Sequence, residues 1–434
     1  MVNKYRHAIF AIWAVVVIQY VRMKVPVLWQ ADWSHDDLMN THRILHTSWI
    51  QIGHDILFFW QPTPLFRPIG ELFYKVLWES IGFSAFGWHF VCGALLIGNA
   101  FLLGHVASRL SGSFSVGLAA TAIASFHSLW AHLYLNTGTV FEILAFSFVY
   151  LGLAAHIEFH NPYLTTALLI LGLNSKESAI VLVVFVVLYE WLWHKRTPWL
   201  FCGLAGSVCL AFILGRVYGP GGLTSIGQYK PSYTLSTYLN NFRGYFGPLV
   251  LWKAIPLWAA IALTLSPLLL RNRLAYFAVL IFAVGILPLA FVPDRGLEGV
   301  YIACAALPLA LSSTLLLMPK ESWRLAGAVA LFVAVGLWML PLEHMDGWDR
   351  EFHEIRSFRE QLKTLEPNPP QNSQMHFLSE PFTEDMNWAS TFITGLVYPD
   401  TSIHVIGAHT PPSPASKIDT HVFEWRDQKL YRIK

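Results

Sequence analysis

The chain has 434 residues, of which 55% are hydrophobic and only 13% are charged, and its formal net charge is +2. Soluble domains are about a quarter charged, so this composition excludes an ordinary water-soluble globule. The small net charge also lacks the basic signature of a nucleic-acid-binding protein, so no nucleic-acid partner is expected. All four cysteines fall inside apolar blocks without zinc spacing, which argues against a disulfide framework: Cys92, Cys202, Cys209 and Cys304.

Apolar blocks recur along residues 1–342, and blocks of about 18 residues or more can cross roughly 30 Å of hydrocarbon. We therefore predict an all-α polytopic membrane domain over 1–342 with about eleven transmembrane helices. The first block lacks a signal-peptidase-like site and is predicted to be a retained helix. The predicted spans are 8–28, 84–107, 114–130, 139–158, 162–174, 178–194, 198–216, 246–270, 274–293, 300–318 and 325–342. The fifth and sixth flank a polar break and are either two half-length segments or two full helices.

The loop between the first two predicted spans, 29–83, is unusually long. Apolar residues recur at intervals of three and four after Asp37, which predicts an amphipathic helix lying on the membrane surface. Pro62, Pro64 and Pro68 then predict a break in helical structure.

Lysine and arginine in the short loops predict which side of the membrane is cytoplasmic. One side carries most of them: Lys4, Arg6, Arg109, Lys195, Arg196, Arg271, Arg273, Lys320 and Arg324. The long first loop, the 217–245 loop and the tail then face the periplasm or an organelle lumen. A bacterial inner membrane, with the functional site facing the periplasm, is the expected location.

The composition changes after Leu342, where charged residues and prolines become frequent. Residues 343–434 are predicted to form a small α/β domain outside the membrane. The predicted elements are a helix at 347–366, a strand at 374–378, a helix at 385–397, a strand at 402–406 and a hairpin at 420–433.

Two adjacent carboxylates, Asp36 and Asp37, follow His35 at the outer end of the first span. A carboxylate buried near lipid has a raised pKa and can serve as a general base, which makes either one a candidate catalytic residue. The alternative is a solvated turn in which Asp37 caps the following helix.

Two further clusters place a cation on the outer side, against the charge rule. Lys176 and Glu177 occupy the break between the fifth and sixth spans, and Arg295 follows Asp294, with Tyr301 six residues on. An ion pair such as Lys176–Glu177 at that depth needs a partner or a cavity, and a fixed guanidinium such as that of Arg295 suits a phosphate group. The alternative for each cluster is a pair at the membrane interface, with Lys176 extending to the surface or Arg295 pairing with Asp294.

Several single polar residues are lesser candidates, because each is also explained by a structural hydrogen bond to a neighbouring helix. They are Arg67, His89, Asn99, Glu142 and Arg243. Nucleotide-binding, serine-hydrolase and zinc-protease motifs are absent from the sequence.

The order of these motifs resembles the C-type (GT-C) membrane glycosyltransferases, closest to the protein O-mannosyltransferase branch and its bacterial relatives. The matching stretches are Asp36-Asp37, Phe66-Arg67-Pro68, Gly87-Trp88-His89, Asn174-Ser175-Lys176-Glu177 and Asp294-Arg295 with Tyr301. The resemblance covers about residues 1–320. The chain departs from the family in lacking the lumenal β-trefoil and the tetratricopeptide tail of some relatives.

The resemblance implies transfer of a sugar, such as the hexose mannose, from a polyprenyl-phosphate donor to an acceptor hydroxyl on a glycan, lipid or protein outside the cytoplasm. It implies Asp36 or Asp37 as the base and Lys176, Arg295 and Arg67 as phosphate ligands. Because a cation can neutralise the leaving phosphate, we expect no cofactor and no required metal. A transporter or flippase of a lipid-linked sugar and a non-catalytic membrane scaffold are the alternatives.

Overall fold

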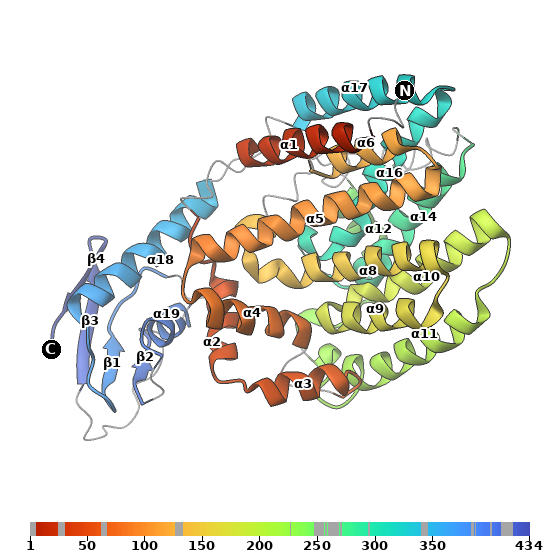
Figure 1. Cartoon of the computed structure of the whole chain (residues 1–434). Helices are drawn as coiled ribbons and strands as arrows, with labels where there is room; N and C mark the ends of the chain where they lie inside the picture. The colour runs from red at the N-terminus through yellow and green to blue at the C-terminus, as the bar shows by residue number, and fades with distance from the viewer. Residues whose placement is uncertain are drawn as a thin grey trace.

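The computed structural model describes residues 6–24, 31–61, 67–125, 133–225, 227–246, 256, 258, 269, 271–293, 296–339, 346–382, 386, 388–399, 402–408 and 420–434. This part of the chain forms a helical bundle with a small C-terminal module that contains a four-stranded sheet (Figure 1).

Within the described residues, six helical segments are long and apolar enough to cross a membrane, so the chain is a helical membrane protein. They are α5 (Ala85–Ser111), η2–α8 (Thr137–Phe159), η3–α10–η4 (Glu177–His194), α11–η5 (Trp199–Val217), α14–α15 (Arg273–Ala290) and η10–α16–η11 (Leu297–Leu317).

The predicted number of about eleven spans is not reached in the described residues. Helix α6 (Phe114–Ser125) has 12 residues and α9 (Pro162–Ser175) has 14. At a rise of 1.5 Å per residue, α9 is about 21 Å long, short of a hydrocarbon core. Helices α1 (Arg6–Lys24) and α17 (Glu321–Met339) are also not among the six. The predicted span 246–270 lies almost wholly outside the described residues.

The bundle has two ends. At the first, which we call the module end, lie the start of α5, the start of α8 and the C-terminal module (Figure 1). At the second, the far end, lie the turn between α5 and α6 and the turn after η4. The pair α5 and α6 approaches closely because both helices carry glycine at the crossing: a Cβ on Gly104 would lie only 2.7 Å from the carbonyl oxygen of Gly117.

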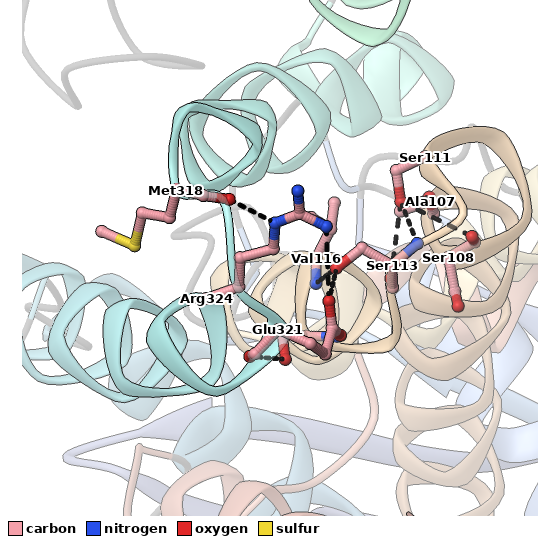
Figure 2. A network of polar contacts seen from close by, with 9 residues as sticks. Ala107, Ser108, Ser111, Ser113, Val116, Met318, Glu321 and Arg324 are labelled. Carbon is pink, nitrogen blue, oxygen red and sulfur yellow. Dashed lines mark hydrogen bonds and ion pairs between the residues drawn. The ribbon is translucent and has the colours of Figure 1, made fainter. Parts of the chain in front are cut away.

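A polar network at the far end fixes the start of α17 to the turn between α5 and α6 (Figure 2). The Glu321 carboxylate accepts hydrogen bonds from Ser113 Oγ at 2.8 Å and from the Ser115 backbone N–H at 2.7 Å. Arg324 Nη1 lies 3.4 Å from Glu321 Oε2, and its Nε donates to the Met318 carbonyl at 2.8 Å. The network thus satisfies the Ser115 N–H, which the start of α6 leaves unpaired, and the Met318 carbonyl just beyond the end of η11.

The first loop contains three helices rather than one: α2 (His35–Leu45), α3 (Trp49–Leu57) and α4 (Pro68–Ile81). The predicted break in helical structure lies before Pro68, because α3 ends at Leu57 and residues 58–61 and 67 are not helical. Pro68 is the first residue of α4, a position whose N–H has no partner inside the helix, so proline is favoured there. Pro62 and Pro64 lie outside the described residues.

The C-terminal module follows the elements predicted from sequence. Helix α18 (Asp346–Leu365) precedes β1 (Gln374–Phe377), α19 (Ala389–Val397), β2 (His404–Ile406), β3 (Thr420–Arg426) and β4 (Lys429–Arg432). The sheet order is β2-β1-β3-β4, with β1 parallel to both neighbours and β3–β4 antiparallel. Three fully buried phenylalanines form the core between α18 and the sheet: Phe358, Phe377 and Phe423.

Ion pairs dock the module onto the first loop. Asp32, only 2% exposed, binds Arg356 Nε at 2.8 Å and Arg359 Nη1 and Nη2 at 2.8 and 3.1 Å. His35 Nδ1 lies 2.7 Å from Glu351 of α18. Helix α19 packs against α2, so one face of α2 contacts the module.

Candidate functional site

A polar cavity of about 410 Å³ lies at the module end. Four of the residues singled out in the sequence line it: Asp36, Arg67, Glu142 and Lys176. The remaining lining residues are Met39, Asn40, Arg43, Gly138, Thr139, Phe141, Leu223, Tyr229 and Glu298. The cavity therefore gathers residues from α2, the start of α4, the start of α8, the residue after α9, the short turns η6 (Leu223–Ser225) and η7 (Gly227–Tyr229), and the start of η10.

Helix α2 contributes a continuous stripe to this cavity. Asp36, Met39, Asn40 and Arg43 follow the spacing i, i+3, i+4, i+7, so their side chains lie on one helical face. Sequence reasoning missed Arg43 and Asn40, although their spacing from Asp36 on a predicted amphipathic helix was the signal that could have found them.

The structure separates the two adjacent carboxylates. Asp37 is fully buried and forms the capping box of α2: its Oδ2 accepts from the Ser34 N–H at 2.9 Å and from Ser34 Oγ at 2.8 Å. Its Oδ1 accepts from Thr137 Oγ1 at 2.5 Å. Both Asp37 oxygens are therefore occupied by a structural role, in which Ser34 rather than Asp37 is the N-cap residue.

Asp36 is exposed and lines the cavity. Its Oδ2 accepts a hydrogen bond from Asn136 Nδ2 at 3.3 Å. The backbone of Gly138 approaches closely, and a Cβ there would lie 2.5 Å from the Asp36 Cβ. Glycine at 138 thus leaves room for Asp36 at the cavity wall.

Burial raises the pKa of Asp37 to about 6, although the nearby His89 and the bonds from Thr137 and Ser34 act in the opposite direction. At pH values between the ordinary pKa of an aspartate and about 6, Asp37 is protonated in the folded protein but ionised in the unfolded chain. This contribution to the free energy of unfolding is complete at low pH and falls as the pH rises through about 6. We expect the melting temperature of the wild type, relative to Asp37→Asn, to fall between pH 4 and 6.5 and to level off above 7. A difference in melting temperature between the two proteins that stays constant over that pH range would contradict a raised pKa of Asp37.

Lys176 occupies the sharp break between α9 and η3. Its backbone is extended, with φ −157° and ψ 140°, which ends α9 and directs the chain into the next segment. Its side chain is buried, with Nζ 2.5 Å from Glu142 Oε1 and 4.0 Å from Glu177 Oε1. The ammonium group is therefore held at the cavity wall by a carboxylate from α8.

Arg67 is the residue before Pro68 at the start of α4. Its Nη2 lies 3.4 Å from both oxygens of Glu177 and 3.3 Å from the Tyr229 hydroxyl. Its guanidinium also stacks over the Phe141 ring, 5.2 Å from the centroid. These contacts orient a planar cation, which suits bidentate binding of a phosphate.

The third cation, Arg43, pairs with the fully buried Glu71. The described lining thus holds three cations and three carboxylates, the latter being Asp36, Glu142 and Glu298.

An apolar groove of about 270 Å³ adjoins the polar cavity. Leu223 and Tyr229 line both spaces, so the two are neighbours at these residues. Glu177 lies at the groove's polar edge, and the other lining residues are mainly apolar or aromatic: Ile180, Phe212, Ile213, Val217, Tyr218, Thr224, Pro231, Tyr233, Leu287, Pro288, Leu289, Phe291 and Val292.

The other residues singled out in the sequence do not line the cavity. His89 is buried, and its two ring nitrogens contact the carbonyl oxygens of Tyr134 at 2.7 Å and Asp32 at 2.9 Å. Tyr301 is buried and stacks on Phe146, with centroids 4.5 Å apart. Asn99 donates to the Ile143 carbonyl at 3.0 Å, and Arg243 is exposed on α12 (Leu235–Phe246). Asp294 and Arg295 lie outside the described residues.

No family model, no curated protein and no solved structure matches this chain. The geometry of the cavity and the groove is therefore what indicates the function of this protein.

Proposed function

We propose that this protein is a membrane glycosyltransferase of the GT-C type, which moves a sugar from a polyprenyl-phosphate donor to an acceptor hydroxyl. One observation carries the proposal: a polar cavity lined by three cations and three carboxylates adjoins an apolar groove. A lipid-linked sugar phosphate has the same two parts, a charged head and a long apolar chain.

Arg67 lies where the cavity meets the groove, which is where the phosphate of such a donor would bind. This residue lines the polar cavity, while its partners Glu177 and Tyr229 line the groove. A phosphate bound by Arg67 and Lys176 would have its sugar in the cavity and its isoprenoid chain among residues such as Phe212 and Phe291. The cavity volume falls within the range of about 300–1,000 Å³ typical of small-molecule sites.

The chemistry follows from the same placement. Asp36 removes the proton from the acceptor hydroxyl, whose oxygen forms a bond to the anomeric carbon of the sugar. The bond from that carbon to the donor phosphate oxygen breaks, and its electron pair leaves with the polyprenyl phosphate. Lys176, Arg67 and Arg43 stabilise the negative charge that develops on the leaving group, so the step requires no metal ion.

The distribution of charge supports a non-cytoplasmic site. The far end carries the short-loop cations: Arg109 pairs with Glu158 at 3.4 Å, and Arg196 pairs with Glu190 at 2.6 Å. By the positive-inside rule, the far end faces the cytoplasm, and the module end faces the opposite compartment. In a bacterial inner membrane, the cavity and the C-terminal module would face the periplasm.

A transfer assay tests the proposal. The full chain in lipid nanodiscs is incubated with a panel of polyprenyl-phosphate sugars and with a membrane extract as acceptor, and released polyprenyl phosphate is quantified. We expect turnover with at least one donor, unaffected by chelator. Donor binding without turnover, together with movement of the donor between leaflets of a proteoliposome, would instead identify a transporter.

Variants of the groove sharpen this assay. Leu287 is 45% exposed and lines the groove, so Leu287→Trp should narrow it and raise KM for long-chain donors more than for short-chain donors. Leu214, 63% exposed and outside the groove lining, supplies the matched control Leu214→Trp. An equal effect of both variants would show that the groove does not hold the lipid chain.

A further inference from the structure

A second cluster of ionisable side chains lies at the far end, away from the cavity. It consists of His156 and His160 at the end of α8 and Glu190 at the start of the π-helical turn η4 (Glu190–His194). Each offers one ligand atom, and these atoms all lie within 4.8 Å of one another. We propose that His156, His160 and Glu190 bind a divalent transition-metal ion of the Zn²⁺ class.

The distances are close to those of a metal-bound set. His156 Nε2 lies 2.9 Å from Glu190 Oε1, and His160 Nδ1 lies 3.8 Å from the same oxygen. Metal–ligand bonds of about 2.0–2.1 Å in a tetrahedron place neighbouring ligand atoms about 3.3 Å apart. Small side-chain rotations therefore bring all three ligands into a coordination sphere, in which the ion replaces the proton between His156 and Glu190.

The backbone presents these groups from two elements. His156 and His160 are four residues apart, so they share one face of the end of α8. His160 is the C-cap of α8 and has a left-handed backbone, with φ 48°, a conformation in which histidine is enriched relative to most residues other than glycine. Glu190 begins a π-helical turn, a feature often found at functional sites.

The burial pattern is that of a site open on one side. The side chains of His156 and Glu190 are 4% and 1% exposed, while that of His160 is 45% exposed. An ion can therefore reach the cluster from water through His160. The cluster's fixed ligands are buried, where they are shielded from competing solvent.

Arg196 positions the carboxylate. Its Nε donates to Glu190 Oε2 at 2.6 Å, and its Nη2 donates to Oε1 at 3.1 Å. On metal binding, Oε2 stays with Arg196 while Oε1 turns to the ion, because ligating carboxylates are usually held by an outer hydrogen bond. His194, whose ring lies 5.7 Å from that of His160, is the nearest further imidazole for a fourth position.

The donor set defines the class of ion. Two imidazoles and one carboxylate suit Zn²⁺ and its neighbours in the first transition row, whereas Ca²⁺ and Mg²⁺ prefer oxygen ligands alone. This site is separate from the transfer chemistry and does not depend on it. Sequence reasoning missed it because Glu190 is far along the chain from His156 and His160.

Metal binding to the full chain in detergent tests the proposal. The protein is stripped with chelator, dialysed and titrated with Zn²⁺, and the bound metal is counted by mass spectrometry. We expect one Zn²⁺ per chain, with X-ray absorption showing nitrogen and oxygen ligands and no sulfur. His160→Asn removes one ligand but keeps a residue that tolerates the left-handed backbone. Loss of a hydrogen-bond partner of a metal ligand weakens binding by up to about 100-fold, so loss of a ligand itself should weaken Zn²⁺ binding by at least that much.

His105→Asn is the matched control. His105 lies at the same end, its side chain is 48% exposed, and it pairs with Glu158 at 2.8 Å, outside the cluster. This variant should bind Zn²⁺ as the wild type does. Absence of stoichiometric binding by the wild type, or equal affinity of the two variants, would overturn the proposal.

Discussion

The variant Asp36→Asn is expected to lose sugar transfer while it still binds the donor. Asparagine keeps the size of the side chain and can still accept the bond from Asn136, but it cannot take a proton from the acceptor. Removal of a general base costs about 10²–10⁴-fold, so we expect kcat to fall by about 10³-fold. Turnover and donor affinity of the purified variant are measured together with its melting temperature, which should stay close to that of the wild type because Asp36 is exposed.

Asp37→Asn is the natural control, since it makes the same chemical change one residue along the chain. An asparagine there turns an acceptor of the capping box into an amide donor that faces the Ser34 N–H. The loss of a helix cap costs about 0.5–2 kcal/mol. We expect a lower melting temperature but substantial transfer per folded molecule. Full stability with abolished transfer in Asp37→Asn, and normal transfer in Asp36→Asn, would place the base at Asp37.

The variant Asp32→Ala is expected to release the C-terminal module from the bundle. It leaves Arg356 and Arg359 facing a buried position without their carboxylate. Breaking a buried pair costs about 3–5 kcal/mol. Because the Arg356 side chain is 37% exposed and that of Arg359 16%, we expect about 3 kcal/mol. Hydrogen exchange should rise across 346–382, where α18 and β1 lie, and stay slow in α8.

Glu354→Ala removes a carboxylate from the same helix without touching this junction. Glu354 pairs with Arg350 at 3.7 Å, and the Arg350 side chain is 78% exposed. An exposed pair of this kind contributes about 0.5 kcal/mol or less, so exchange should remain close to wild type. If Asp32→Ala exchanges as slowly as Glu354→Ala, the ion pairs do not hold the module.

The secondary structure of the C-terminal module could be predicted because it follows from local sequence patterns. Its helices and strands follow the predicted ranges closely, because alternating burial in β3 and the polar face of α18 are local signals. The number of membrane spans could not be predicted in the same way. Hydropathy does not distinguish the 14-residue α9 from a full span, since a short helix buried against α8 and α11 is equally apolar.

The candidate site divides in the same way. The sequence identified Asp36 and Asp37 as candidates because they are adjacent carboxylates. The sequence alone could not show which of the two faces a cavity. That depends on contacts from about a hundred residues along the chain: Asn136 donates to Asp36, and Thr137 donates to Asp37. Glu298 and Tyr229 gave no sequence signal at all, because only tertiary packing brings η10 and the η7 turn to the cavity.

Each cation in the described part of the cavity lining pairs with a carboxylate, and this has a consequence for the end of the proposed catalytic cycle. A pocket of bare cations would bind the spent carrier lipid most tightly, since its phosphate gains charge once the sugar has gone. Here each cation would keep an ion pair with a carboxylate after the carrier departs. The pairs are Lys176 with Glu142, Arg67 with Glu177 and Arg43 with Glu71. The product can therefore leave without exposing uncompensated charge at the membrane surface.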